Sequence, residues 1–275
     1  MTKEEIQELG WDTILKRAVN DPGLIHEAYS SFHNFSIGNQ ILAMFQCLEL
    51  GISAGPIDTF LGWKEKGRYV KRGEKALYLW QPFAGKKTEV DEETGEEKKV
   101  PFLYFKLMPR WFVVSQTDGE DAKFPEITGW DLDRALADLE ISNVEFTETN
   151  GNIQGVAYQL FDGIKKIAVS PIAVNPMKTA VHEIAHVLHG HIEKGTLVDR
   201  EQLTHEIAEV EAEGVALIVI AALGLPGEEY SRGYIQHWWG LGNEIPEDSA
   251  RRIFSIANKI LEAGRESNGP KTDSE

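Results

Sequence analysis

The stretch "TAVHEIAHVLHGH", residues 179–191, decides both the local fold and the chemistry that this sequence can support. His182 and His186 are four residues apart, so on a helix their imidazoles lie on one face, at a distance that a single zinc ion can bridge. Glu183 lies beside them, where its carboxylate can act as a general base toward water that the metal activates. The stretch therefore predicts a helix with two metal ligands and a catalytic glutamate.

The alternative is that H-E-x-x-H arises by chance in a chain that holds 8 histidines. The residues between and after the motif are apolar, which predicts a helix that is buried on most sides. Two histidines and a glutamate inside such a helix would be costly to bury without a shared partner. The context therefore favours a metal site.

A catalytic zinc needs a third protein ligand, and the extended pattern H-E-x-x-H-x-x-G-x-x-H is absent from this chain. Downstream, "EVEAEGVAL" offers Glu209 and Glu213 on one face of a predicted helix, with Glu211 turned about 200° away. Glu209 could be the third ligand, while Glu213 accepts the second N–H of a liganding histidine. The alternative is a solvated acidic face. We predict that His189 and His191 are not ligands.

Charge is unevenly distributed along the chain. The net charge of −16 argues against nonspecific adhesion to nucleic acid. Residues 62–80, "GWKEKGRYVKRGEKALYLW", nevertheless hold six basic residues against two acidic ones, a local net charge of +4, interleaved with aromatic residues. A positive groove with rings for base stacking is typical of single-strand binding. The residues expected to contact nucleic acid are Asn39, Trp63, Lys64, Arg68, Lys71, Arg72 and Lys75. The alternative is that Trp63 belongs to a core and that Asn39 caps buried backbone.

The length of 275 residues and the change in amino-acid composition along the chain predict two domains. We expect an α+β fold, with an N-terminal α+β nucleic-acid-binding domain at residues 1–118 and a C-terminal domain at 125–263. The latter should hold a small antiparallel sheet, a three-strand meander that includes "VEFTE", and several helices. Residues 264–275 form a polar tail that we expect to be disordered.

Single helices are expected over 3–19 and, kinked near Gly38, over 24–50. Two strand regions, "YVKRGEKALYLWQPF" and "PFLYFKLMPRWFVVSQ", are expected to flank an acidic hairpin tip at 91–97. Cys47 is the only cysteine, and the N-terminal residues show no signal-peptide pattern. The longest apolar run is shorter than the roughly 20 residues that cross a bilayer. We therefore expect a cytoplasmic protein without a membrane partner.

Four segments together resemble the ArdC-type antirestriction family: "HEIAH…EVEAEGVA", "FSIGNQILAMFQ", "WKEKGRYVKRGEKALYLWQPF" and "FVVSQTDG". The resemblance covers nearly the whole chain except the tail. It implies an N-terminal single-stranded-DNA-binding domain and a C-terminal zincin-like metallopeptidase domain. It further implies that His182, His186 and Glu209 bind the metal, that Glu183 is catalytic, and that Tyr234, in a segment with Ser231 and Trp238, stabilises an oxyanion.

The chain departs from the family pattern at two positions. His205 stands where an arginine is often found, which affects the electrostatics of the pocket, and Val113 replaces an aspartate on a strand.

These expectations combine into an antirestriction protein that binds single-stranded DNA and uses Zn²⁺ or another divalent metal for peptide hydrolysis. Two alternatives stay open: a cytosolic regulatory metalloprotease that cleaves a protein partner, and a DNA-covering protein without relevant protease activity. Nucleic-acid mimicry is less favoured, because the basic segment contradicts an acidity spread over the whole surface. The sequence assigns neither a protein substrate nor an oligomeric state.

Overall fold

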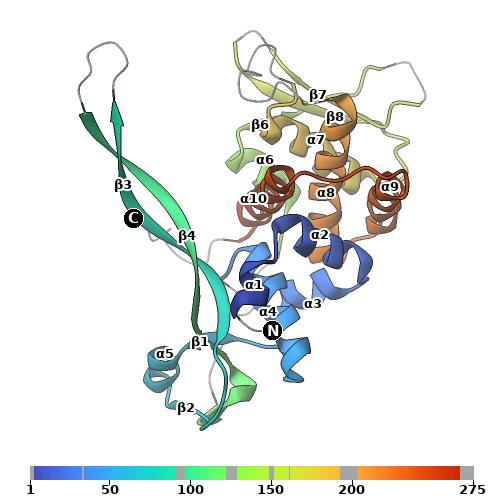
Figure 1. The fold of residues 1–275 in the computed structure, drawn as a ribbon. Coiled ribbons are helices and arrows are strands. Elements are labelled where there is room, and N and C mark those ends of the chain that lie inside the picture. Colours follow the sequence, from blue (N-terminus) through green and yellow to red (C-terminus); the bar gives the residue numbers. More distant parts are fainter. Residues whose placement is uncertain are drawn as a thin grey trace. The chain divides into compact units, whose positions relative to one another are not determined.

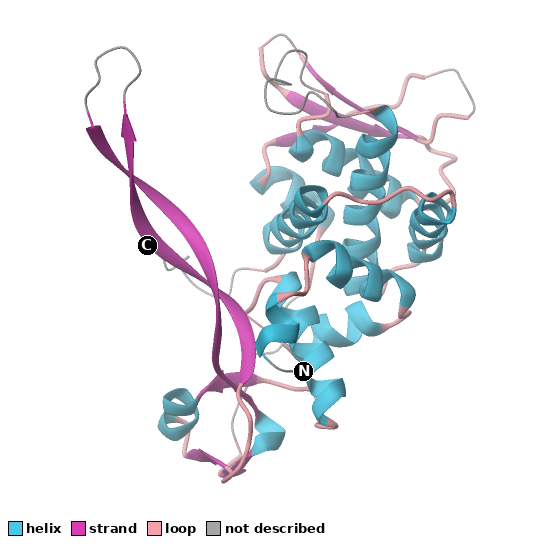
Figure 2. Ribbon diagram, in the orientation of Figure 1, coloured by secondary structure: helices cyan, strands magenta, loops and turns pink. Residues whose placement is uncertain are grey.

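The computed structural model describes residues 3–32, 34–90, 97–121, 129–148, 152–160, 162–192 and 204–266. Within these ranges, helices and small sheets occur without a regular strand–helix alternation, so the predicted α+β class is confirmed (Figure 2). The chain divides into two compact units. The first unit comprises Met1–Glu8 and Leu42–Phe124, and the second comprises Leu9–Ile41 and Pro125–Glu275.

A long antiparallel ribbon dominates the first unit, where β3 (Leu77–Val90) pairs with β4 (Glu97–Val113) (Figure 1). The ribbon confirms the two expected strand regions, while residues 91–96 of the predicted acidic tip lie outside the described residues. The other elements of this unit are α1 (Lys3–Gln7), β1 (Ile57–Thr59), α5 (Phe60–Glu65), β2 (Arg68–Val70), η1 (Val114–Gln116) and β5 (Thr117–Gly119). β1 pairs with β4, and β2 pairs with β5.

Two polar side chains hold the core of the first unit together. Gln46, on α4 (Ile37–Leu50), accepts a hydrogen bond from the backbone N–H of Tyr78 and donates one to its carbonyl, both at 2.8 Å. The indole N–H of Trp63 donates to the carbonyl of Phe112, also at 2.8 Å. Because buried polar groups need partners, these bonds fix α4 on β3 and α5 on β4.

Helices make up most of the second unit (Figures 1 and 2). They are α2 (Trp11–Asn20), α3 (Leu24–Ser31), α6 (Leu132–Asp138), α7 (Pro176–His189), α8 (His205–Ala222), α9 (Glu228–Gly240) and α10 (Glu247–Ala263). α8 is the central helix, since α3, α7, α9 and α10 all pack against it and residues 210–222 are all buried. In the described part of the chain, none of the helices has both the length and the apolarity that a membrane crossing requires.

The sheet of the second unit has the strand order β6-β8-β7 and packs against α7. Its strands are β6 (Ile141–Asn143), β7 (Gly155–Gln159) and β8 (Lys165–Val169). β7 runs antiparallel to β8, but β6 runs parallel to it. The expected meander is therefore wrong, as is the strand expected at "VEFTE". The chain enters β6 directly from α6, and the pairing with β8 ends where the N–H of Val144 donates to the carbonyl of Ile167.

The expected helices at 3–19 and 24–50 are each divided in two. Gly10 has an extended backbone and begins α2, while Phe32, with φ −117° and ψ 79°, ends α3. The apolar positions were identified correctly. The spacing of apolar residues does not reveal a break between two helices when both helices bury the same side.

The second unit includes a segment that the sequence analysis placed in domain 1–118. Leu9–Ile41 packs with the C-terminal helices: α2 contacts α9 and α10, and α3 contacts α8. Polar contacts support this packing, since the N–H of Asp12 donates to Glu247 at 3.1 Å and that of Ile37 donates to Asn258 at 3.1 Å. We expected each domain to be one uninterrupted stretch of sequence, because the sequence does not show which domain an amphipathic helix packs against.

Candidate metal centre

Helix α7 presents the predicted motif on a rigid support. Pro176 occupies its first turn, where the missing N–H costs nothing, and Gly190 ends it in the left-handed conformation with φ 75°. His186 follows His182 by four positions, so their rings lie one turn apart, and their Nε2 atoms are 3.1 Å apart. The helix therefore aims two ring nitrogens at one point.

Helix α8 brings the predicted third ligand to that point. Glu209 places Oε2 3.6 Å from His182 Nε2 and Oε1 3.4 Å from His186 Nε2. The ligand atoms of these three residues all lie within 4.8 Å of one another, a spacing that one cation can bridge. Among the described residues, the structure thus brings together the predicted ligand set, which we call the metal cluster.

Glu213 occupies the position expected for a residue that orients a ligand. Its Oε1 atom lies 3.3 Å from His182 Nδ1, the ring nitrogen that faces away from the cluster. Lys178 holds the same oxygen at 2.5 Å. The sequence analysis missed Lys178, although it stands one turn before His182 on the same face of α7. A carboxylate held by Lys178 can in turn fix the ring of His182.

The electrostatics of the cluster suit a cation. Burial, together with the neighbouring His182, lowers the pKa of His186 to about 3, so this ring is neutral, as a ligand must be. The polar contact with His182 lowers the pKa of Glu209, more than burial raises it, and keeps this group a carboxylate. Two neutral imidazoles and one carboxylate form the donor set of many catalytic zinc sites.

Glu183 is nearly buried beside the cluster. It is 7% exposed, and burial raises the pKa of its carboxyl to about 7. Strand β7 approaches it so closely that a Cβ atom on Gly155 would lie 2.7 Å from Glu183 Oε1 and 2.6 Å from the methyl group of Thr179. Only glycine at position 155 leaves room for this carboxylate in its observed position.

A pocket of about 370 Å³ opens onto the metal cluster. Glu183, His186 and Glu209 line it from the helices, and Ala157 lines it from β7. β7 is an outer strand of its sheet, so its second edge has no strand partner among the described residues. The pocket has the volume for a small ligand or a short segment of chain beside Glu183, His186 and Glu209.

Tyr234, predicted to stabilise an oxyanion, lies on α9 and is 39% exposed. Burial raises the pKa of its hydroxyl, and so do the negative charges of Glu209 and Glu213. The hydroxyl of Tyr234 is thus influenced by the charges of the site, and it keeps its proton. Of its predicted companions, Ser231 is buried and Trp238 is half-buried.

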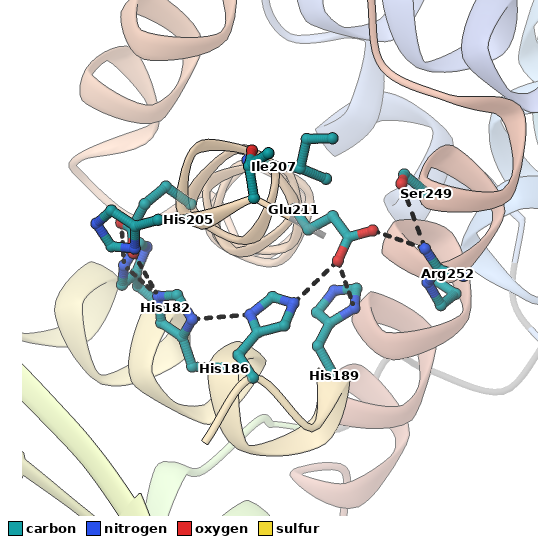
Figure 3. Close-up of polar contacts among 11 residues, drawn as sticks. His182, His186, His189, His205, Ile207, Glu211, Ser249 and Arg252 are labelled. Atoms are coloured by element: carbon teal, nitrogen blue, oxygen red, sulfur yellow. Dashed lines mark hydrogen bonds and ion pairs between the residues drawn. The ribbon is translucent and has the colours of Figure 1, made fainter. Parts of the chain in front are cut away.

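A second cluster of similar composition lies beside the first and was missed as a unit by the sequence analysis (Figure 3). His189, His191 and Glu211 place their polar atoms within 4.8 Å of one another. Glu211 is turned away from the metal cluster, as predicted, and it is fully buried, which excludes the alternative of a solvated position for this residue. The available signal was its place in the otherwise apolar run of α8, since a lone carboxylate there requires a partner. We call these residues the buried cluster.

The N-terminal part of the chain matches a known protein family. Residues 6–108 match the family model described as the N-terminal domain of anti-restriction factor ArdC. This part of the chain is therefore similar to the N-terminal domain of ArdC. The match ends before the metal cluster, so the assignment of the cluster depends on geometry alone. No curated protein matches the chain.

Two solved structures resemble this chain, both of the antirestriction ArdC protein from R388 plasmid. The metal-free structure has 23% sequence identity and a TM-score of 0.48, and covers 92% of this chain and 94% of that chain. The Mn(II)-bound structure has 21% identity and a TM-score of 0.49, and covers 94% and 99%. Both TM-scores lie below 0.5, so neither likeness carries an argument about this chain.

The residues predicted to bind nucleic acid differ in their surroundings. Trp63 is 0% exposed, so it is a core residue and not a stacking surface. Arg68 is engaged in the fold, because its guanidinium donates to the side chain and carbonyl of Thr117 at 2.8 and 3.1 Å. Lys71 donates to the carbonyl of Ser115 at 2.9 Å.

The other members of the predicted set differ in their exposure. Asn39 is half-buried in the first turn of α4, while Lys64, Arg72 and Lys75 are exposed. The basic surface of segment 62–80 is therefore smaller than its composition suggests, because this hairpin region uses Arg68 and Lys71 to close β2 onto its neighbours.

Proposed function

We propose that this chain is a metal-dependent, metallopeptidase-like antirestriction protein that binds single-stranded DNA through its first unit. The observation that carries the hydrolytic part is the convergence of His182, His186 and Glu209 at a pocket that also exposes Glu183. The antirestriction part is supported by the family match over residues 6–108. Zn²⁺ is the cation that we assign, because two imidazoles and a carboxylate with room for water are a zinc donor set.

The chemistry follows from the placement of the side chains. When bound, the cation would supply Lewis-acid chemistry, polarising a carbonyl and lowering the pKa of water in the site. Glu183 accepts the proton of the attacking water and later delivers it to the leaving amine. The hydroxyl of Tyr234 donates a hydrogen bond to the developing oxyanion. The free edge of β7 offers backbone groups with which an extended peptide can pair.

Single-strand binding is supported by the exposed rings and cations of the first unit. On the ribbon, Phe105 is 61% exposed, and the ammonium of Lys106 lies 5.1 Å from the ring centre of Tyr104. Further exposed cations line both strands: Lys86, Lys87, Lys98 and Lys99. Stacking on rings between basic residues is how sequence-tolerant single-strand binding works. Lys64, Arg72 and Lys75 extend this surface.

The hydrolytic proposal is tested with the purified full chain and a library of unstructured peptides. The wild type, reconstituted with Zn²⁺, should cleave peptides and lose this activity when a chelator removes the cation. The exchange Glu183→Gln should abolish cleavage and leave the metal content unchanged. Cleavage that survives the Glu183→Gln exchange would contradict the proposal.

The nucleic-acid proposal is tested by measuring oligonucleotide affinity against salt. Replacing Lys64, Arg72 and Lys75 together by Gln should reduce the log–log salt slope by about 2, because each lost phosphate contact contributes about 0.7 for single strands. Exchanging Glu4, Glu5 and Glu8 of the same unit for Gln is the matched control and should not reduce the slope. A zero slope for the wild type would exclude phosphate contacts.

A second candidate function is a DNA-covering protein in which hydrolysis has no part. The specific observation that favours it is the separation of the two features, since the metal cluster lies in the second unit and the exposed ribbon in the first. If cells that express the Glu183→Gln variant resist restriction as well as cells with wild type, covering DNA is sufficient for protection.

A further inference from the structure

A chain of polar contacts leads from the metal cluster into the protein interior (Figure 3). His186 Nδ1 lies 2.8 Å from His191 Nδ1. The other nitrogen of that ring, His191 Nε2, lies 2.9 Å from Glu211 Oε2. The second oxygen of Glu211 accepts a hydrogen bond from Arg252 at 2.9 Å. Four side chains from α7, the turn after it, α8 and α10 are therefore connected in sequence.

The position of the protons along this chain follows from the role of His186. Its Nε2 atom faces His182 and Glu209, so this nitrogen must keep its lone pair for a cation. The proton of the neutral ring then lies on Nδ1 and points at His191 Nδ1, which must accept it. His191 therefore carries its own proton on Nε2, from which it donates to Glu211.

Burial fixes the groups at the inner end. The side chain of Glu211 is 0% exposed and that of His191 is 4% exposed, so water does not compete for their hydrogen bonds. Arg252, whose side chain is 40% exposed, places its guanidinium 2.9 Å from Glu211 Oε1 and holds this carboxylate in place. Glu211 is thus a fixed acceptor that leaves His191 one orientation.

We propose that His191 and Glu211 are positioning residues that hold His186 in the tautomer and orientation needed to bind the cation. This inference rests on the proposed metal site. It goes beyond it by assigning the buried cluster, through His191 and Glu211, as a support for His186 and not as a second metal site. A second cation would need the lone pair of His191 Nε2, which would move the proton to Nδ1. That proton would then face the proton on His186 Nδ1 across 2.8 Å.

His189 provides a matched control for His191. The two rings are stacked, with centroids 4.8 Å apart and planes inclined by 8°. His189 Nδ1 also lies near the same oxygen, 3.3 Å from Glu211 Oε2. Both rings are of the same size, both are buried, and both lie near the carboxylate of Glu211. The series of contacts to His186, however, runs through His191. A loss of packing would affect both variants, whereas a loss of positioning would affect only one.

The experiment titrates the metal-free full chain with Zn²⁺ and, for its absorption spectrum, with Co²⁺. The proteins compared are the wild type, His191→Phe, His189→Phe and His191→Asn. The wild type should bind one equivalent. His191→Phe should bind about 10–100-fold more weakly and shift the Co²⁺ bands, the usual cost of losing a residue that orients a ligand. His189→Phe should stay within about threefold of the wild type.

His191→Asn separates hydrogen bonding from packing. The Oδ1 atom of asparagine can occupy the place of the lost Nδ1 acceptor, so this smaller side chain should restore affinity to within about threefold. A packing role predicts the reverse order, with Phe tolerated and Asn not. Thermal unfolding checks that each variant folds. Glu211→Gln, which keeps the shape but removes the charge, is used if His191→Phe does not fold, and it should weaken binding about tenfold.

The outcomes separate the two proposals. If the wild type binds no cation, or if His186→Ala binds as well as the wild type, the metal site itself is wrong. If the wild type binds one equivalent and His191→Phe equals His189→Phe, the positioning role is wrong. Two equivalents in the wild type, with one lost in both phenylalanine variants, would instead show that the buried cluster holds a metal.

Discussion

The two clusters on α7 and α8 contain the same residue types but differ in access. In the metal cluster, His186 and Glu209 line a pocket of about 370 Å³. In the buried cluster, His191 also lines this pocket, but the side chains of His189 and Glu211 are 0% exposed, and Arg252 already supplies a positive charge to the carboxylate. Two histidines and a glutamate therefore do not define a metal site. Under the proposed function, the cluster assigned to the cation differs from the other in its solvent access and in having, among the described residues, a carboxylate that no arginine holds.

The largest expected effect is the loss of the metal from His186→Ala. This exchange removes one of three ligands, so the metal content of the purified protein should fall from one equivalent to a trace. His205→Ala is the control. His205 Nδ1 lies 3.8 Å from Glu209, but its side chain is 84% exposed, so metal content should not change. Elemental analysis measures the metal content of both variants. Metal retained by His186→Ala would show that the metal cluster does not differ from the buried cluster in binding the cation.

Glu183→Gln should lower peptide hydrolysis by about 10²–10⁴-fold, the range for the loss of a general base. Metal content should stay at one equivalent, since Glu183 is not among the three ligands. Glu206→Gln, on the exposed first turn of α8, is the matched control and should retain activity. Initial rates on one cleaved peptide provide the measurement. Equal rates for both variants would show that the pocket is not a hydrolytic site.

Arg252→Met should destabilise the protein by about 3 kcal/mol, because it leaves the carboxylate of Glu211 buried without its positive partner. The neighbour Arg251 is the control. It makes only surface ion pairs, 3.6 Å from Glu247 and 3.2 Å from Asp248, so Arg251→Met should cost less than about 1 kcal/mol. Urea unfolding compares the two. Equal stabilities of the two variants would mean that the ion pair between Arg252 and Glu211 does not stabilise the buried cluster.

Gly155→Ala should have the smallest effect, a loss of activity of about tenfold with the metal retained. The added methyl group would displace Glu183, and a small displacement of a catalytic group costs rate without removing ligands. Gly240→Ala adds a methyl group in open space and should leave activity unchanged. Full activity in Gly155→Ala would show that Glu183 need not stay where the structure places it.

The sequence predicted that His182, His186 and Glu209 would lie together, because helical geometry is rigid. The spacing of His182 and His186 fixes their relation once α7 forms, and Glu209 and Glu213 are related in the same way on α8. The buried cluster could not be predicted, since it depends on the turn that returns His191 toward α8 and on Arg252 from a third helix. Neither relation is encoded by local spacing.

The basic segment was harder to interpret for a related reason. Strand pairing decides whether a cation faces solvent or closes the fold, and the pairing of β2 with β5 joins residues about 49 positions apart, as in the bond from Arg68 to Thr117. Trp63 likewise pairs with the distant Phe112. The composition identified a segment rich in charged and aromatic residues. It could not show which of these residues lie on the surface and which lie in the core.

The packing of Leu9–Ile41 with the C-terminal helices constrains how this protein can evolve. A single genetic crossover between relatives near residue 120 would join helices α2 and α3 from one parent to the α8–α10 surface of another. Buried residues such as Leu15 and Ile25 would then meet a surface that was not selected with them. Successful chimeras should therefore retain both parts of the second unit from one parent and exchange only the segment between them.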